Sequence, residues 1–213
     1  MELLYFFGLA MVAYFLGGLN GAIITSRLIY KDDIRKHGSG NAGLTNFFRT
    51  YGSRVIVLVL LIDVLKPAVP VILGGMLLES ALTFGAPTER VILGRTFGGV
   101  FAMLGHAYPC LYRFKGGKAV LAGGTAALFI DIRVFAVIMA VFVLVVFLTR
   151  YVSLGSVLAG IALPTAFVIF HLGLWSTVLA FCGGVLVVYR HHGNIARLLK
   201  GEERKLSFGK KER

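Results

Sequence analysis

Residues Gly105–Val120 read GHAYPCLYRFKGGKAV and interrupt a chain that otherwise consists largely of long apolar runs. The stretch combines the cations Lys115 and Lys118 with the glycine pair Gly116 and Gly117. Glycine lets a backbone approach a ligand closely, and cations bind phosphate oxygens through charge-assisted hydrogen bonds. Crossing a bilayer requires none of these residues. The stretch therefore predicts a polar loop between membrane helices that binds a phosphate-bearing substrate.

The composition is typical of polytopic membrane proteins. Hydrophobic residues make up 57% of the 213 residues and charged residues 15%, and the mean hydropathy is +0.83. These values exclude an ordinary soluble fold. Because a span needs about 20 residues, a chain of this length holds several. We expect an all-α integral membrane protein in which residues 1–213 form one domain.

The net charge of +12 does not predict a nucleic-acid partner. The cations lie between apolar runs, where positive charge sets topology and meets anionic lipid headgroups. The only cysteines, Cys110 and Cys182, belong to no CxxC or histidine-rich pattern, so they predict neither a disulfide framework nor a metal site. We expect membrane lipid and small phosphate-bearing molecules as partners, no cofactor, and a monomer.

Seven apolar segments predict seven membrane helices. The second segment, Val55–Leu78, contains two prolines, which predict a kink. The fourth, Ala119–Ile130, is long enough to span only if its helix begins inside the GGK turn, residues 116–118. The segments are Leu4–Ser26, Val55–Leu78, Val91–Leu111, Ala119–Ile130, Val134–Leu148, Val152–His171 and Leu174–Tyr189.

Lysine and arginine are distributed unevenly between the connecting segments. They gather after the first span, in Gly105–Val120 and in a basic tail from about Arg190, whereas the alternate connections hold only Arg90, Arg95 and Arg133. Basic loops stay in the cytoplasm. We therefore expect the amino terminus outside, the carboxyl terminus in the cytoplasm, and three polar segments together on the cytoplasmic face.

The first polar segment is HGSGNAGLTNFFR, His37–Arg49, with a formal GxGxxG pattern. No strand precedes it, and the acid about 20 residues further on, Asp63, lies inside a span, so a dinucleotide site is not expected. A glycine-rich turn at a helix start binds oxyanions; a capped loop without a ligand is the alternative. The candidate substrate-binding residues are Ser39, Gly40, Asn41, Thr45 and Asn46, with Arg49 on the helix that follows.

The segment Gly105–Val120 departs twice from the phosphate loop of nucleotide hydrolases, GxxxxGK[ST]. Tyr112 occupies the position of the first glycine, and Ala119 follows the lysine. Lys118, at a helix start, is the expected ligand-binding cation, together with the two glycines before it. Lys115 is equally well explained by contact with lipid phosphate.

The third polar segment is YRHHGNIARLLKGEERK, Tyr189–Lys205. On a helix that continues from the last span, His191 and Asn194 share one face and His192 points elsewhere, so the adjacent histidines are a poor metal pair. Arg197 lies on roughly the same side as Asn194. The alternative is a basic stop anchored in lipid headgroups, which leaves Asn194 unexplained.

Asp63 and Lys66 occupy positions i and i+3 of the second span and predict an ion pair about 15 Å deep in the membrane. The pair either holds two helices together or borders the site, and the sequence leaves both open. His106 ends the third span beside the glycine-rich loop. As a lone histidine it has an ordinary structural explanation, but its position also makes it a candidate for substrate binding.

Three segments resemble, in their order and separation, the three motifs of the bacterial acyl-phosphate:glycerol-3-phosphate acyltransferases, the PlsY family: SGNAGLTNFFR, GHAYPCLYRFKGGKAV and RHHGNIARLLKGEE. The resemblance covers the whole chain. It implies a bacterial inner-membrane enzyme with seven helices and a cytoplasmic active site. The implied reaction moves a fatty acyl group from acyl phosphate to the 1-hydroxyl of glycerol 3-phosphate, giving lysophosphatidic acid and phosphate.

The resemblance also assigns roles and shows departures. The family usually has glycine where this chain has Pro67 and Ala119, and residues 74–95 look longer than the corresponding link; these differences concern the local backbone and the outer loop. The residues that the resemblance implies in holding substrate phosphates are Ser39, Arg49, Lys118, His191 and Asn194. Those that it implies in shaping the first loop are Gly40, Asn41, Thr45 and Asn46.

The chemistry expected of this site needs no covalent enzyme intermediate. Acyl phosphate is a mixed anhydride with a good leaving group, and the chain has no GxSxG pattern. We expect direct attack by the glycerol hydroxyl, with Lys118, Arg49 and His191 as catalytic residues and with either His191 or the acceptor's phosphate as base. Two other functions remain open: a transporter of organic phosphates, with cations near the membrane midplane, and a lipid-binding scaffold.

Overall fold

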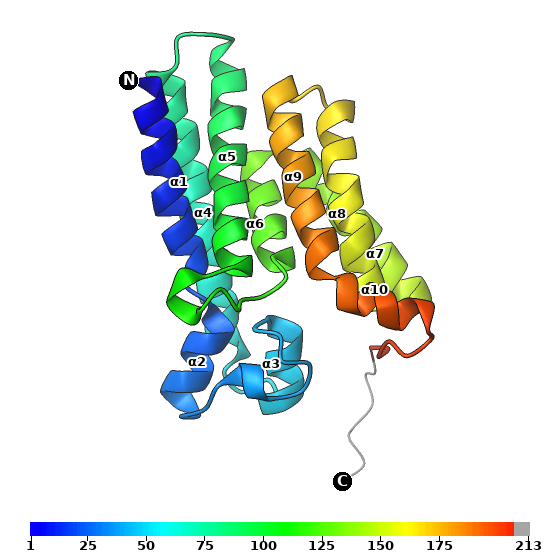
Figure 1. Cartoon of the computed structure of the whole chain (residues 1–213). Helices are drawn as coiled ribbons and strands as arrows, with labels where there is room; N and C mark the ends of the chain where they lie inside the picture. The colour runs from blue at the N-terminus through cyan, green and yellow to red at the C-terminus, as the bar shows by residue number, and fades with distance from the viewer. Residues whose placement is uncertain (207–213) are drawn as a thin grey trace.

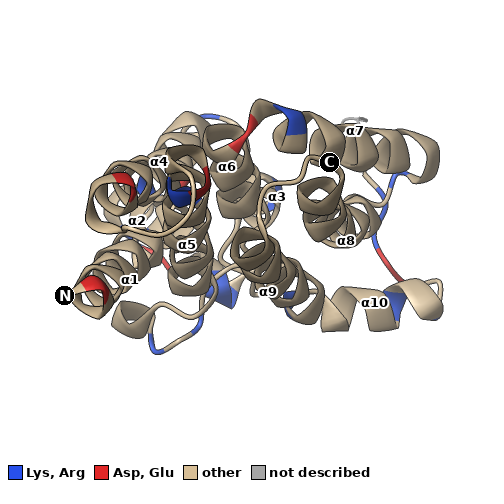
Figure 2. Ribbon diagram, turned by 90° about the horizontal axis from the view of Figure 1, so that it is seen from above, with Lys and Arg blue, Asp and Glu red and all other residues tan. Residues whose placement is uncertain are grey.

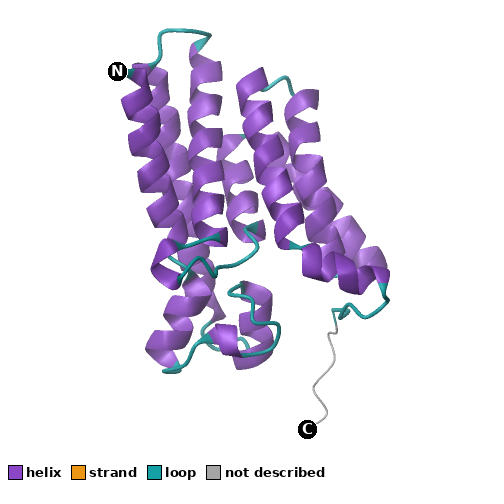
Figure 3. Ribbon diagram, viewed as in Figure 1, coloured by secondary structure: helices purple, strands orange, loops and turns teal. Residues whose placement is uncertain are grey.

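The computed structural model describes residues 1–206, and every regular element in that range is a helix (Figure 3). Two are short 3₁₀ helices, η1 and η2, and the others are α-helices. The elements are α1 (Glu2–Gly18), α2 (Gly21–Ile29), η1 (Ile34–Lys36), α3 (Leu44–Tyr51), α4 (Ile56–Ala81), α5 (Pro87–Ala107), η2 (Cys110–Tyr112), α6 (Val120–Ile130), α7 (Ile132–Thr149), α8 (Val152–Ile169), α9 (Leu174–Arg190) and α10 (His192–Leu199).

The helices α1, α4, α5, α6, α7, α8 and α9 form a bundle in which successive members run in opposite directions (Figure 1). Helix α5 lies at the centre, where it packs against α1, α4, α6 and α9. Helices α2 and α3 pack with η1 on the lower end of α4. The loop before α6 and helix α10 lie at the same end of the bundle as α2 and α3, so the three polar segments share one end (Figure 1).

Glycine allows the central helices to approach closely. At the crossing of α4 and α5, a Cβ atom on Gly74 or on Gly94 would overlap the backbone of the other residue, so the two helices touch through their main chains. Gly17 on α1 meets the backbone of Ala102 on α5 in the same way. Close contact through small residues is how helices associate in a bilayer, where apolar burial gives no advantage over lipid.

The outer surface of the bundle suits a lipid environment. Helix α7 is largely exposed along its apolar length, with Phe147 and Leu148 among its exposed side chains. Seen from above, the helices are mostly uncharged, and charged residues gather near helix ends and in connecting segments (Figure 2). Three helices, α4, α7 and α8, are long and apolar enough to cross a membrane, and the bent pairs α1–α2 and α9–α10 raise the total to five. The chain is a multi-pass membrane protein.

The expected first span, Leu4–Ser26, is not one straight helix. It divides into α1 and α2, whose axes differ by 42°. Leu19 and Asn20 have extended backbones at the break, and the Asn20 side chain caps α2 by accepting a hydrogen bond from the Ile23 N–H. Because Asn20 satisfies a backbone donor that a continuous helix would satisfy itself, the chain can turn here.

The central spans differ from their expected bounds. Helix α5 begins at Pro87, which suits the first turn of a helix, and ends at Ala107, before Pro109. Helix α6 begins at Val120, just after the GGK turn rather than inside it, so its 11 residues extend only about 16 Å. Helix α4 is continuous from Ile56 to Ala81 and contains both prolines, Pro67 and Pro70.

Candidate active site

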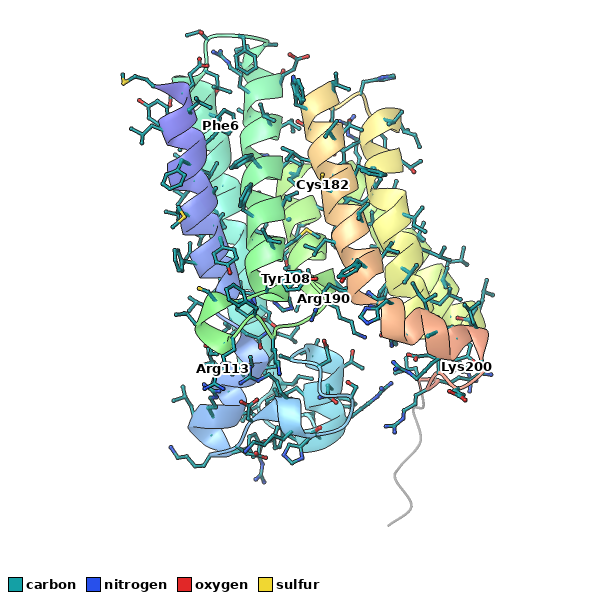
Figure 4. The ribbon with its side chains drawn as sticks, viewed as in Figure 1. Phe6, Tyr108, Arg113, Cys182, Arg190 and Lys200 are labelled. Atoms are coloured by element: carbon teal, nitrogen blue, oxygen red, sulfur yellow. The ribbon has the colours of Figure 1, made fainter. Side chains whose placement is uncertain are left out.

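The GGK loop, defined here as residues 113–119, is held in place from two sides. The Gly117 N–H donates to the carbonyl of His106 at 3.0 Å. From α9, Arg190 donates through Nε to the carbonyl of Gly117 at 3.0 Å and through Nη2 to that of Gly116 at 3.2 Å. Its guanidinium also lies 4.9 Å from the centre of the Tyr108 ring, and Figure 4 shows the two side chains next to each other. The loop conformation therefore depends on α5 and α9 together.

Gly117 is buried at a position where no larger residue fits. A Cβ atom there would overlap Nε2 of His106 and lie 2.7 Å from the carbonyl oxygen of Ala42. Ala42 belongs to the first polar segment, and the amide of Asn20 donates to the same carbonyl at 3.0 Å. The GGK loop and the first polar segment thus meet at this glycine, as the placement of both on one face predicted.

Lys118 is half-buried and reaches the third polar segment, where its Nζ donates to Oδ1 of Asn194. Burial is the main cause that lowers the pKa of Lys118 to about 8. The positive charges of Arg197, Arg190 and Arg49 lower it as well, whereas Glu203 raises it. Lys118 therefore lies in a predominantly cationic environment to which all three polar segments contribute.

The third polar segment does not continue the helix of the last span. Helix α9 ends at Arg190, and α10 leaves it at 56°, so the expected continuous helix is wrong. His191 occupies the break. His191 and Asn194 are nevertheless both buried, and His192 is exposed, which agrees with the expected division of these side chains.

His191 is positioned as a neutral hydrogen-bond acceptor. Its Nδ1 lies 2.7 Å from the carbonyl oxygen of Val187, and because a carbonyl only accepts, Nδ1 carries the proton and Nε2 presents a lone pair. Burial lowers the pKa of His191 to about 4, with a further contribution from the charge of Lys118. The imidazole is therefore uncharged at neutral pH.

Glu203 organises this wall of the site. One of its oxygens accepts from Asn194 Nδ2 at 2.6 Å and from Ser153 Oγ at 2.9 Å, and the other accepts from Arg197 at 2.7 Å. The carboxylate fixes the orientation of the Asn194 amide, so that the amide oxygen faces Lys118. Ser153 was not expected here, because a serine within an apolar segment carries no recognisable signal.

Asn46 shapes the first polar segment from inside. Its Oδ1 accepts from the Ser39 N–H at 3.1 Å, and its Nδ2 donates to the carbonyls of His37 and Asn41 at 3.0 and 3.1 Å. Its amide groups are thus engaged within the loop. Asn46 therefore acts on the conformation of the loop, which is the part that the resemblance implies for it, and direct contact of Asn46 with substrate stays a prediction.

The other candidates of the first segment lie at the surface of this end of the bundle. The side chains of Ser39, Thr45 and Arg49 are exposed, together with Gly40, and Asn41 is half-buried. Arg49 contributes to the field at Lys118. Ser39 and Arg49 are available to an incoming anion.

His106 lies deeper than the other candidates. It is buried at the end of α5, where its Nδ1 is 2.6 Å from Nζ of Lys66. Lys66 in turn lies 2.8 Å from the carboxylate of Asp63, which confirms the ion pair expected at positions i and i+3.

Two residues contribute to the site although the sequence did not single them out. Arg190 holds the GGK loop, and Asn20 holds the first polar segment. Arg190 had an ordinary explanation as a cation at the end of a span.

Comparison with known proteins agrees with this arrangement. Residues 7–201 match the family described as glycerol-3-phosphate acyltransferase. The glycerol-3-phosphate acyltransferase of Finegoldia magna is 37% identical over 211 residues, covering 97% of this chain and 98% of its own. This chain belongs to the glycerol-3-phosphate acyltransferase family. It is therefore an acyltransferase of phospholipid synthesis, as the three motifs implied.

Solved structures of the same family have the same fold. The glycerol 3-phosphate form of PlsY, an integral membrane glycerol 3-phosphate acyltransferase, superposes with a TM-score of 0.82 at 31% identity, covering 95% of this chain and 96% of that one. The lysophosphatidic acid form of PlsY gives a TM-score of 0.80 at 30% identity, covering 95% of both chains. The glycerol-3-phosphate acyltransferase of Staphylococcus carnosus, 34% identical over 93% of this chain and 96% of its own, is a further relative.

Proposed function

We propose that this acyltransferase moves a fatty acyl group from acyl phosphate to the 1-hydroxyl of glycerol 3-phosphate, and releases lysophosphatidic acid and inorganic phosphate. The observation that carries the proposal is the position of Lys118. Its ammonium group has a neutral amide as its hydrogen-bond partner. The charges whose fields reach it are those of one carboxylate, Glu203, and of three arginines, Arg49, Arg190 and Arg197. A site with this excess of positive charge suits two anionic substrates that must be brought together against their mutual repulsion.

An apolar groove beside the site suits the acyl chain of the donor. The groove has a volume of about 340 Å³ and runs between α5 and α9. Its lining includes Cys182, which lies on α9 farther from the loop end of the bundle than Arg190 does (Figure 4). The lining extends to Tyr189, the residue next to Arg190. A donor with its chain in this groove places its phosphate beside the GGK loop. The lining residues are Val100, Phe101, Leu104, Cys182, Val185, Leu186 and Tyr189.

The proposed reaction is a direct transfer. The 1-hydroxyl oxygen of glycerol 3-phosphate forms a bond to the acyl carbon, the bond from that carbon to the phosphate oxygen breaks, and phosphate leaves with both bonding electrons. Lys118 and Arg49 stabilise the charge on the leaving phosphate. The hydroxyl proton passes to a base and then to the released phosphate.

His191 orients the attacking hydroxyl. Its Nε2 has a lone pair that accepts the hydroxyl hydrogen bond, but a pKa of about 4 makes it a weak base at neutral pH. The acceptor's own phosphate, with a second pKa near 6, is the better base. We therefore assign binding and orientation of the acceptor to His191, Asn194 and Ser39, and proton acceptance to the substrate phosphate.

The same proposal includes the membrane arrangement. The bundle helices α1 and α4–α9 make seven passes, the short α6 together with the loop before it, with the amino terminus outside and the carboxyl-terminal segment in the cytoplasm of a bacterial inner membrane. The excess of lysine and arginine at the end that carries the site supports this orientation. The proposed active unit is a monomer.

One assay tests the acyl donor and the reaction. Purified protein receives labelled glycerol 3-phosphate with acyl phosphate, acyl-CoA or acyl carrier protein in parallel. We expect labelled lysophosphatidic acid from acyl phosphate and an equal amount of inorganic phosphate. Lys115→Ala is the matched control, because Lys115 is exposed and should retain activity. Product from a thioester donor alone would contradict the proposal.

The role of His191 is tested by His191→Gln. If His191 orients the hydroxyl, glutamine should raise the KM for glycerol 3-phosphate and retain much of kcat. A loss confined to kcat, by more than about 100-fold, would identify His191 as the base. Isolation of an acyl-enzyme by mass spectrometry after mixing with acyl phosphate would contradict direct transfer.

A further inference from the structure

A buried cluster of three ionisable side chains lies directly behind the GGK loop. Lys66 Nζ is 2.8 Å from the Asp63 carboxylate and 2.6 Å from Nδ1 of His106, and all three side chains are at most 4% exposed. The other side of the cluster reaches the break between α1 and α2, where the Gly21 N–H donates to Asp63 at 3.0 Å. Charged groups inside a membrane protein are costly and usually functional, and the reaction proposed above does not use Asp63 or Lys66.

The contacts determine which nitrogen of His106 carries the proton. Lys66 Nζ lies at ion-pair distance from the Asp63 carboxylate, 2.8 Å, and the ammonium group of such a pair has donors but no acceptor. Nδ1 of His106 must therefore accept the hydrogen bond from Lys66. The ring is then neutral, with its proton on Nε2, where it forms a donor.

The Nε2 donor faces the loop that binds substrate. Nε2 occupies the place that a side chain on Gly117 would take, so this edge of the ring packs directly against the loop. Within residues 1–206 no protein acceptor is hydrogen-bonded to Nε2. His191, on the opposite wall, has the reverse arrangement, because its Nδ1 donates to Val187 and its Nε2 accepts. The two histidines thus present one donor and one acceptor.

We propose that the Asp63–Lys66 pair fixes the tautomer of His106, so that Nε2–H donates a hydrogen bond to a substrate phosphate oxygen beside Gly117. This makes Lys66 a positioning residue and His106 a neutral phosphate-binding residue. The inference rests on the function proposed above. The phosphate belongs either to glycerol 3-phosphate or to the acyl donor, which present the same oxygens. The charged groups whose fields reach the ring are Lys66, Asp63 and Arg190.

The first test observes the tautomer itself and needs no turnover. Protein labelled with ¹⁵N-histidine is examined by NMR, with His106→Asn to assign the signals. We expect the Nε2–H form in the wild type and a change in the Nε2 signal when glycerol 3-phosphate is added. In Asp63→Asn/Lys66→Met, which removes both buried charges and so avoids an unpaired one, the fixed tautomer should be lost. A wild-type spectrum with the proton on Nδ1, or an unchanged tautomer in the double variant, would overturn the proposal.

The second test uses kinetics with two substitutions of His106. Asparagine places its amide near Nδ1 and keeps the acceptor for Lys66, whereas glutamine reaches the position of Nε2 and keeps a donor there. His106→Asn should raise the KM of one phosphate substrate about 10- to 100-fold, the range for a lost hydrogen bond to a charged group, and His106→Gln should raise it less. Separate KM values for glycerol 3-phosphate and acyl phosphate identify which phosphate is bound. Equal KM values in both variants and the wild type would contradict the donor role.

The two tests separate this inference from the proposed function. A wild-type protein that shows the Nε2–H tautomer but makes no lysophosphatidic acid from acyl phosphate would contradict the reaction alone. An active wild type with the other tautomer would contradict the inference alone.

Discussion

Two lysines, Lys66 and Lys118, are removed from solvent to different degrees and have different partners. Lys66 lies inside the bundle with a carboxylate, Asp63, and an imidazole. Lys118 lies at the end of the bundle, is half-buried, and donates to the neutral amide of Asn194. Its nearest carboxylate, Glu203, is engaged by three other side chains. Lys66 thus has its counter-ion within the protein, and the difference supports the proposal that Lys118 receives its counter-ion with the substrate.

The largest effect should come from removing the counter-ion of Lys66. Asp63→Ala leaves a buried cation without its partner, which costs about 3–5 kcal/mol of stability. Thermal unfolding in detergent should show a strongly lowered midpoint. Asp63→Asn/Lys66→Met removes both charges and should lose much less stability. A single variant as stable as the wild type would show that Lys66 does not depend on Asp63.

The corresponding change at Lys118 should affect activity and leave the fold intact. Lys118→Met removes the cation that we propose faces the reacting phosphate, and loss of one such group costs about 10²- to 10³-fold in rate. Stability should change little, because Lys118 has no charged hydrogen-bond partner within residues 1–206. Product formation and thermal unfolding are measured together, with Lys115→Met as the control. Substantial activity in Lys118→Met would remove this residue from the site.

Which site residues the sequence predicts depends on how many structural explanations each residue has. A lysine, an asparagine and a histidine beside long apolar runs have few structural explanations, so Lys118, Asn194 and His191 stood out. Ser153 did not, because one serine in an apolar helix also serves helix packing. The partners of Asp63 and Lys66 were equally hidden, since the spacing predicts their ion pair but not that His106, 40 residues after Lys66, completes the cluster.

The fold was predicted where hydrophobic length determines it. The expected segment Val55–Leu78 corresponds closely to α4, and Val152–His171 to α8. The breaks were missed because they depend on local hydrogen bonds. At Asn20 a side chain caps the next helix, and at His191 the helix ends while the polar pattern continues. In both places the chain bends next to the site, so the deviations from simple spans are those that bring the polar segments together.

Gly117 connects the two lysine environments, since it lies between His106 and Lys118. Gly117→Ala introduces a Cβ atom that overlaps His106 and crowds Ala42, and such overpacking costs about 1–3 kcal/mol. We expect a loss of about 10- to 100-fold in kcat/KM, mainly through KM. Gly124→Ala on α6 is the control, because its Cβ would meet no atom within 4 Å. Equal activity of the two variants would show that the loop does not require this close approach.

The smallest effect concerns the protonation of Lys118. Its pKa of about 8 means that the ammonium is present below pH 8 and is lost as the pH rises above it, whereas an ordinary lysine stays charged to beyond pH 10. Because kcat/KM reports the free enzyme, kcat/KM for acyl phosphate should fall above about pH 8. Arg197→Gln removes a cation that lowers this pKa and releases Glu203, which raises it, so the fall should move to higher pH. Arg113→Gln, at an exposed position outside this network, should leave the profile unchanged. A profile that stays flat to pH 10, or that responds equally to both substitutions, would show that the pKa of Lys118 is that of an ordinary lysine. Lys118 would then not differ from Lys66 in lacking a counter-ion within the protein.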